Sequence, residues 1–287
     1  MTSSEASTGR RCHGVVNPLH SAVYFAPEPE EEFVAVGLEP GGMAYLAGRA
    51  APLGAVGAGA VTATFYNFSH ELVRRYIPAA WALAAPEQVL AARLRGADRT
   101  LRRLLGEEVI GSAEMAEAAG LALRAAEGCG REGRPLYAAH AGLPVPEEPH
   151  LALWHAATLL REHRGDGHLA ALAVAGLSGV EALVLHSATG KAPTAELFMR
   201  TRGWSEDEWG AARGRLRERG LVDEAGGLTE AGAGLREEAE ALTDRLDAAP
   251  YDLLGPAGTA RLTELAGGFT KALVAAGAFP AALFGKG

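Results

Sequence analysis

Apolar side chains recur at helical spacing along most of this chain, and this spacing limits the fold more than any other feature. In residues 86–105, for example, valines and leucines lie on one face and five arginines, Arg93 among them, lie elsewhere. Such a stripe is typical of an amphipathic helix at a protein surface. One short segment, residues 221–229, instead has apolar ends around a Gly-Gly pair that is typical of a hairpin turn. The sequence therefore predicts an all-α, mainly helical protein with one small β-hairpin and no extended sheet.

Composition excludes several classes of protein. With 287 residues and 48% hydrophobic content, the chain can bury a substantial core. Its two cysteines, Cys12 and Cys129, are too few for a disulfide framework and lack the spacing of a zinc or redox motif. Because zinc-protease, dinucleotide, P-loop and serine-hydrolase motifs are missing, we expect no metal and no cofactor. The formal net charge of −8 works against non-specific attraction to nucleic acid, which needs a basic surface.

The apolar segments are short. No window approaches the roughly 18 uninterrupted apolar residues that a membrane span requires. Residues 1–14 are polar and small, and they lack the apolar segment of a signal peptide. We therefore expect a cytoplasmic protein without membrane contact, whose N-terminal tail is disordered.

From residue 179 onward the chain has a distinctive order of elements. Pro193 and Ser205 are typical of helix starts, and Gly203 with Trp204 predicts a turn between two helices. The expected elements are helices at 180–186, 194–202 and 205–219, the hairpin at 221–229 and a long helix at 230–246. Helix, helix, turn, helix, hairpin, helix is the order of a winged-helix domain.

Two resemblances extend this interpretation. The segment with Leu228, Thr229 and Gly232 resembles the winged-helix domains of MarR-type regulators, over about a quarter of the chain. A wider resemblance covers most of the chain and rests on GRAAPLG at 48–54, FYNF at 65–68 and LREHRGDGHLAAL at 160–172. With these motifs the chain resembles an actinobacterial helix-turn-helix family of largely unassigned function. The resemblance implies an architecture and DNA recognition by the third helix of the motif, and it implies no substrate.

Four regions are expected. Residues 1–14 form the disordered tail, and residues 15–176 form a helical region that holds a ligand pocket. Residues 177–250 form the winged helix-turn-helix domain, and residues 251–287 form a C-terminal helical tail.

The charge of the predicted third helix complicates DNA recognition. Residues 206–208 are all acidic, and the hairpin at 221–229 has two acids and no basic residue, so both places would repel phosphates. Arg213 and Arg217, in the later half of the helix, are the candidate DNA contacts. Contact with DNA and a role in packing or partner binding are equally compatible with this balance, and the sequence leaves a homodimer open.

The stretch at 160–172 concentrates ionisable side chains between two apolar helical runs. Gly165 and Gly167 let the chain turn sharply, so we expect a polar corner between two buried helices. Such a corner would present imidazoles, a carboxylate and guanidiniums to one pocket.

His163, Asp166 and His168 are the candidate catalytic residues if the protein is an enzyme. The two imidazoles would exchange protons and the carboxylate would fix a tautomer, while Arg161 or Arg164 would hold an anionic group. The alternative is structural, because the Asp166 carboxylate is well placed as an N-cap for a helix that starts at the next residue. Groups of this kind between apolar helices favour a genuine site.

An aromatic set near the N-terminus is most simply core, and it would also serve as the wall of an apolar ligand pocket. The polar residues that would anchor a small-molecule ligand there or near the corner are Arg49, Tyr66, Asn67, His70 and His155.

Two functions remain. The first is a ligand-responsive winged-helix regulator that contacts DNA or a protein. The second is an enzyme of small-molecule metabolism that retains the winged helix as a scaffold and uses the polar corner for acid–base chemistry. The resemblance favours the first, and the acidic charge favours the second.

Overall fold

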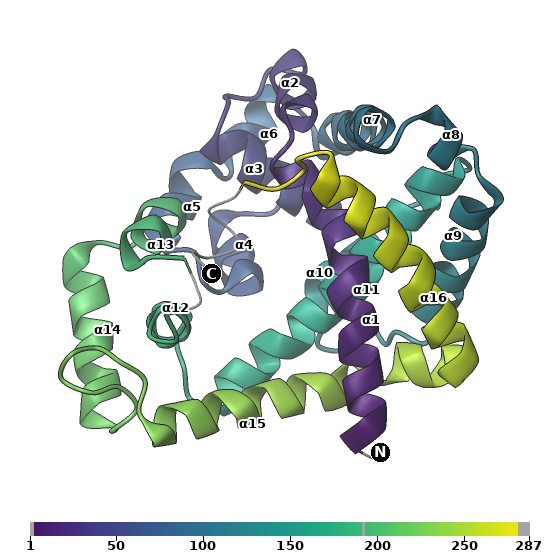
Figure 1. Ribbon diagram of the computed structural model, residues 1–287. Helices are drawn as coiled ribbons and strands as arrows, with labels where there is room; N and C mark the ends of the chain where they lie inside the picture. The colour runs from purple at the N-terminus through teal and green to yellow at the C-terminus, as the bar shows by residue number, and fades with distance from the viewer. Residues whose placement is uncertain (1–2, 191–192, 281–287) are drawn as a thin grey trace.

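The computed structural model describes residues 3–190 and 193–280, and these fold almost entirely into helices (Figure 1). The first half contains α1 (Ser3–Ser21), η1 (Ala22–Tyr24), α2 (Pro27–Ala35), α3 (Gly42–Ala50), η2 (Ala51–Leu53), α4 (Ala58–Phe65), α5 (His70–Tyr76), α6 (Ala79–Leu83), α7 (Pro86–Leu105), α8 (Glu107–Ile110) and α9 (Ala113–Ala126). The second half contains α10 (Pro135–His140), α11 (Pro149–Val174), α12 (Gly179–Ser187), α13 (Ala195–Arg202), α14 (Glu206–Glu218), α15 (Glu230–Leu246) and α16 (Ala249–Ala275). The prediction of a mainly helical protein is confirmed.

The predicted β-hairpin wing is wrong. The part of the chain that the structure describes contains no β-strand, and the expected hairpin is reduced to an isolated bridge between Val222 and Leu228. The Asp223 carboxylate accepts a hydrogen bond of 2.7 Å from the backbone N–H of Gly227, and the Asp223 N–H donates to the Gly227 carbonyl at 2.9 Å. The segment therefore closes on itself as a tight turn with a single bridge.

The predicted disorder of residues 1–14 also differs from the structure, because α1 begins at Ser3. Cys12, Val16 and Leu19 are buried at helical spacing, and α1 packs against α16 and α11. The first residues are mostly polar, so the sequence did not predict a helix there. The apolar residues of α1 are buried against α16 and α11, which are distant in sequence.

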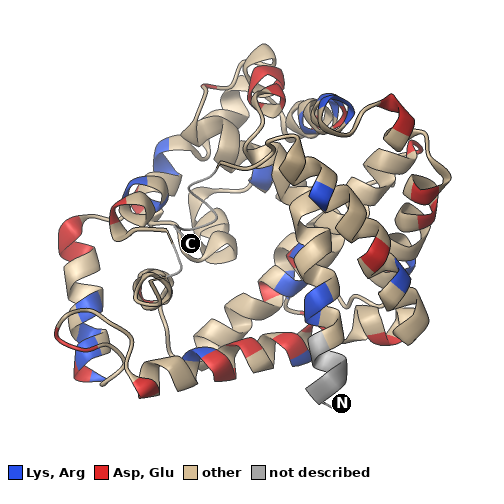
Figure 2. Ribbon diagram, viewed as in Figure 1, with Lys and Arg blue, Asp and Glu red and all other residues tan. Residues whose placement is uncertain are grey.

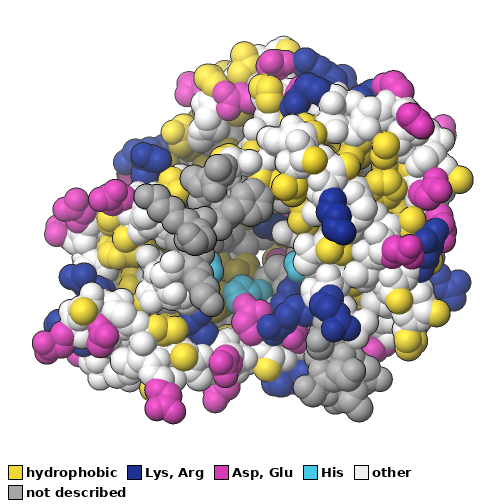
Figure 3. All heavy atoms as spheres, viewed as in Figure 1, with side chains coloured by type: hydrophobic (Ala, Val, Ile, Leu, Met, Phe, Trp, Pro, Cys, Tyr) yellow, Lys and Arg dark blue, Asp and Glu magenta, His cyan; other side chains and the backbone are white. Residues whose placement is uncertain are grey.

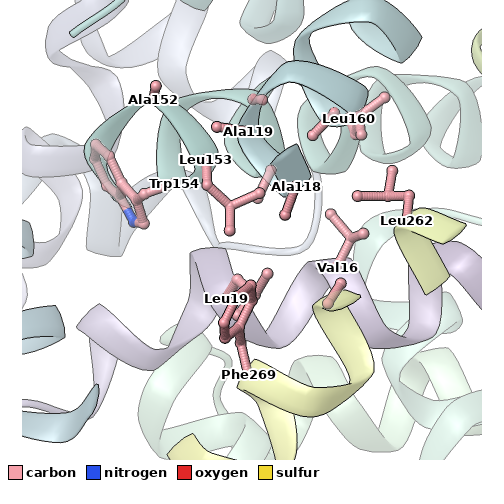
Figure 4. Packing of buried hydrophobic residues seen from close by; sticks show 14 of the residues in the cluster. Val16, Leu19, Ala118, Ala119, Ala152, Leu153, Trp154, Leu160, Leu262 and Phe269 are labelled. Atoms are coloured by element: carbon pink, nitrogen blue, oxygen red, sulfur yellow. The ribbon is translucent and has the colours of Figure 1, made fainter. Parts of the chain in front are cut away.

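The largest hydrophobic core surrounds α11 and is formed with α1, α9 and α16. Figure 4 shows Val16 of α1 and Leu262 of α16 on the side of Leu160 of α11, while Leu19 of α1 lies toward Leu153 of α11. The core therefore unites the two ends of the described chain around one central helix.

Two smaller cores complete the fold. One lies among α2 to α7 and includes Leu46, Val73 and Ile77. The other lies within α12 to α14 and includes Leu185 and Leu216. Figure 1 shows α12 to α14 at one side of the molecule, with α15 running from them to the start of α16.

Hydroxyl side chains define the starts of the C-terminal helices, as the sequence predicted for Ser205. Ser178, Thr194, Ser205 and Thr229 each accept a hydrogen bond from the backbone N–H three residues later. Such caps satisfy N–H groups that have no partner within the helix, so the boundaries follow from local sequence.

No single helix within residues 3–190 and 193–280 is long and apolar enough to cross a membrane. Helices α11 and α12 meet the length and composition requirement only as a pair, and they are bent by 94° where they join.

Candidate functional site

Residues 160–172 do not form a corner. They lie inside α11, which continues as one helix from Pro149 to Val174. Gly167 is required for space, because a Cβ built there would lie 2.7 Å from the Arg134 guanidinium. That guanidinium donates hydrogen bonds to the backbone carbonyls of His163 and Leu246. The glycine therefore admits an arginine between α11 and α15, and the predicted turn is wrong.

The three candidate catalytic residues contact three different partners. His163 Nδ1 lies 2.9 Å from Asp247 Oδ1, and His168 Nδ1 lies 2.9 Å from Thr243 Oγ1, both on or just after α15. Asp166 accepts hydrogen bonds of 3.0 and 2.9 Å from the backbone N–H groups of residues 136 and 137. Its carboxylate therefore caps α10 and not, as predicted, a helix of its own. Burial raises the pKa of Asp166 to about 6, because those hydrogen bonds only partly offset the loss of water.

An ion-pair cluster joins α11 to α15. Arg164 lies at its centre, with Nη1 2.9 Å from Asp244 Oδ1 and 3.6 Å from Asp247 Oδ2, and Nη2 3.3 Å from Glu240 Oε2. Arg10 of α1 adds a second guanidinium 2.6 Å from Asp244. We call these residues, with His163, the α11–α15 cluster. Each of its charged groups has a partner of opposite sign within the protein.

A second polar group lies on another side of α11 and is charged differently. It contains Arg49 of α3, Arg93 of α7, and Arg161 and Glu162 of α11, and we call it the cationic centre. Glu162 is buried and pairs with Arg161, while its other oxygen is 3.7 Å from Arg49 Nη2. Burial disfavours the carboxylate, but the neighbouring guanidiniums outweigh this and lower the pKa of Glu162. Three cations therefore share one anion.

Arg93 is the residue without an ionic partner. It is only 6% exposed, and among the described residues no carboxylate pairs with it. Its guanidinium lies 4.8 Å from the Trp154 ring centroid, with Nη1 3.5 Å from His140 Nδ1, and it is within hydrogen-bonding reach of the Tyr24 phenol. Nη2 is buried and has no hydrogen-bond partner in the described part of the chain.

The other groups around the cationic centre are neutral. Burial and the nearby arginines hold the pKa values of His20 and His140 well below their usual range. Arg49 stacks 4.4 Å from the Phe65 centroid, and its Nη1 donates a 3.3 Å hydrogen bond to the Tyr45 hydroxyl. Its Nε is buried without a partner among residues 3–190 and 193–280. The excess positive charge is therefore not cancelled by these neighbours.

Two cavities adjoin these residues. One of about 80 Å³ is lined by Arg93 with Tyr24, Tyr45, Gly48 and Phe33, among others. A second, of about 330 Å³, lies between α11, α12, α15 and the segment after α4. Figure 3 shows a hollow on the viewed face between α1 and α12, with histidine side chains exposed within it.

The structure distributes the predicted ligand-binding residues over several places. Arg49 and Arg161 meet in the cationic centre, while Tyr66 and Asn67 line the larger cavity, as does the catalytic candidate His168. The remaining ones lie apart from one another: His70 is exposed and bonds Thr62 at 2.9 Å, Arg164 belongs to the α11–α15 cluster, and buried His155 has a pKa lowered to about 4 by burial and by the charge of Arg93.

Arg93 was not predicted as a site residue, because it was grouped with the other arginines of its helix, away from the apolar face. A signal was present, because Arg93 lies four residues after Val89 and four before Ala97, and both are fully buried. That spacing puts its side chain on the buried face of α7. Glu162 and His20 carried no comparable local signal.

The turn between α13 and α14 docks on the segment at 66–69. Trp204 Nε1 donates a 2.9 Å hydrogen bond to the Asn67 carbonyl, and the Ser69 N–H donates to the Arg202 carbonyl at 2.8 Å. The Arg202 guanidinium lies 4.5 Å from the Phe68 centroid. Gly203 has φ of 75°, and a Cβ there would lie 2.5 Å from Leu72. The FYNF motif therefore holds the turn against the N-terminal helices.

Two arginines of α14 form no ion pair with the described residues. Arg215 pairs with Glu181 at 2.7 Å, and Arg219 donates to carbonyls at the end of α11. Arg213 and Arg217 are exposed and have no ion pair within the described residues. Figure 2 shows acidic residues at the start of α14 and basic residues along its later half.

Helices α12 to α14, with the tight turn before α14, define a helix-turn-helix protein. The chain belongs to a helix-turn-helix family, whose sequence profile matches residues 9–280. Neither the curated proteins nor the solved structures contain a match to this chain. The matched residues include both the N-terminal helices and the helix-turn-helix motif.

Proposed function

We propose that this chain is a DNA-binding regulatory protein that reads DNA with α14. The observation that supports this most directly is the pair Arg213 and Arg217. They are four residues apart on the exposed side of α14, the third helix of the motif, and no carboxylate of the described residues pairs with them. Arginines in this position contact phosphates or guanine edges when the helix enters the major groove.

The start of α14 makes this binding selective. Glu208 is used in the helix cap, where it accepts hydrogen bonds of 2.9 and 2.8 Å from the N–H and hydroxyl of Ser205. Glu206 and Asp207 remain exposed and would repel phosphates. We therefore expect weak binding to generic duplex DNA, and tight binding only where base contacts offset this repulsion.

The contacts between the helix-turn-helix motif and the N-terminal helices support regulation by a small molecule. The turn of the motif rests on Asn67, Phe68 and Ser69, so a ligand that shifts this segment would also shift α14. The enzymatic alternative gains no support, because His163, Asp166 and His168 are each engaged by separate structural partners. Homodimer formation stays a prediction.

The test is selection of bound duplexes from a random pool, followed by mobility-shift titration at several salt concentrations. The wild type should enrich one sequence and bind unselected duplex at least 100-fold more weakly, as is common for specific binders. The double variant Arg213→Ala/Arg217→Ala should bind the enriched sequence at least tenfold more weakly, with a shallower salt dependence.

Arg124→Ala is the matched control, because Arg124 is an exposed arginine near the end of α9, in a different part of the molecule. It should bind the enriched sequence like the wild type. An unenriched pool, or a double variant with unchanged affinity, would contradict the proposal.

A further inference from the structure

We propose that the cationic centre binds a small organic carboxylate, with Arg93 as its principal ligand-binding residue. Binding of the carboxylate stands on the geometry of this site alone. Its role as the effector of DNA binding rests on the function proposed above.

Charge is the first argument. Arg49, Arg93 and Arg161 surround the single carboxylate of Glu162, and the nearby imidazoles are neutral. Buried cations are ordinarily paired, because an unpaired charge away from water is strongly unfavourable. The site therefore has a deficit of negative charge that an anionic ligand would supply.

Helix α7 provides an internal comparison. Four of its arginines lie near the surface, and each one pairs with a carboxylate: Arg95 and Arg99 with Glu32, Arg102 with Asp98, and Arg103 with Glu28. Arg93 is the buried arginine of this helix, and it has no such partner among the described residues. A purely structural role would favour the opposite arrangement, because burial raises the need for a counter-charge.

The unpaired guanidinium of Arg93 lies at a cavity, whereas Arg49 is not among the residues that line it. Arg93 Nη2 and Arg49 Nε are both buried without a hydrogen-bond partner in the described chain, and Arg93 lines the cavity of about 80 Å³. A guanidinium presents its N–H groups in a planar fork that matches a carboxylate. A cavity of this size has space for more than one water-sized group.

The residues that line this cavity indicate which kind of organic group carries the carboxylate. The cavity is lined by Val23, Tyr24, Phe33 and Tyr45, and by Gly48, where a Cβ would lie 2.5 Å from the Phe33 ring. Glu30 also lines the cavity, but it is exposed and accepts a hydrogen bond from the Gly41 N–H, whereas Arg93 is buried. A largely apolar wall with a buried cation fits an organic acid with a short apolar or aromatic body better than it fits inorganic phosphate.

Contacts lead from this site to the helix-turn-helix motif. The Tyr45 ring, which hydrogen-bonds Arg49, lies 5.9 Å from the Phe68 ring. Phe68 in turn supports Arg202 at the end of α13. A ligand that moves Tyr45 would therefore act on the residues that hold the turn of the motif.

The test measures thermal unfolding and calorimetric binding in buffer free of other anions but chloride. The probes are acetate, benzoate and phenylacetate at 20 mM, with benzamide as the neutral counterpart of benzoate and inorganic phosphate as the second anion class. At least one carboxylate should raise the Tm of the wild type by several degrees, and benzamide should not. A Tm shift with phosphate and with no carboxylate would show that the ligand is not a carboxylate. If no carboxylate shifts the Tm, the proposal of a carboxylate site is wrong.

Arg93→Met should abolish the shift without lowering the Tm of the unliganded protein, because it removes an unpaired buried cation. Arg95→Met, two residues along the same helix but exposed, is the control and should retain the shift. Arg93→Lys keeps the charge and removes the fork, and it should bind at least tenfold more weakly. The Arg93→Lys variant tests the proposal even if Arg93→Met fails to fold. Normal carboxylate binding by both Arg93 variants would contradict the assignment.

These measurements contain no DNA, so a negative result would not contradict DNA binding by α14. Equally, if no DNA sequence is enriched in the selection, carboxylate binding is not contradicted. The effector role is then tested on the selected duplex. The active carboxylate should change the affinity of the wild type for that duplex severalfold and leave Arg93→Met unchanged. An equal response in both proteins would exclude this site as the effector site.

Discussion

Helix α11 carries two polar groups that are adjacent in sequence and opposite in character. Arg161 and Glu162 belong to the cationic centre, while the next two residues, His163 and Arg164, belong to the α11–α15 cluster. Successive residues of a helix point about 100° apart, so this short stretch reaches two different neighbourhoods.

The two groups differ in how their charges are compensated. In the α11–α15 cluster each guanidinium meets carboxylates, and the cluster fastens α15 to the central helix. In the cationic centre three guanidiniums share one carboxylate, and two guanidinium nitrogens have no partner among the described residues. Ionisable residues in a buried position are therefore not a sufficient sign of a ligand site. The uncompensated charge distinguishes such a site from a structural one.

The largest expected effect is the loss of Arg164. Replacing it by Met leaves Asp244 and Asp247 facing each other without their central cation. Breaking a buried pair in this way typically costs about 3–5 kcal/mol, and we expect a loss of that order in the free energy of unfolding. Urea denaturation monitored by circular dichroism measures it.

Arg95→Met is the control for this variant as well, because an exposed ion pair contributes roughly 0–1 kcal/mol. Equal losses in the two variants would remove the distinction drawn between the α11–α15 cluster and surface pairing.

A medium effect is expected at Asp166, which receives hydrogen bonds but no cation partner. Its pKa is about 6 in the folded protein against an ordinary value of 3.8, so the folded state holds the proton more tightly. This contribution to stability is present below about pH 4 and is lost as the pH rises through 6. Relative to Asp166→Asn, the wild type should lose on the order of 2 kcal/mol between these limits.

Paired urea titrations of the wild type and Asp166→Asn at pH 4, 5, 6 and 7 test this, because other titrating groups cancel in the difference. A difference that stays constant with pH would show that the carboxyl does not titrate in this range.

The smallest effect is expected for His168→Ala, which removes the contact with Thr243. One hydrogen bond contributes about 1 kcal/mol, so the Tm should fall by a few degrees. Carboxylate binding should remain at the wild-type level, because His168 lies on the side of α11 that faces α15 and does not belong to the cationic centre. Loss of carboxylate binding in this variant would mean that the two polar groups of α11 act as one site.

Local sequence determined much of the fold. Helix starts at Ser205 and Thr229, the extent of α7, and the order of helices α12 to α15 could all be predicted. A cap or an apolar stripe involves residues within a few positions of each other, so its energy is already present in the local sequence.

Tertiary structure decided the candidate site. The glycines in α11 predicted a turn, but Gly167 instead admits Arg134 from another segment. His163 meets Asp247 across 84 positions of sequence, and Arg49 lies 3.7 Å from Glu162 although the two residues belong to separate helices. The sequence shows where ionisable residues lie. Only the folded chain decides which of them are compensated, because the energy of a buried charge depends on the side chains that packing brings within a few ångströms of it.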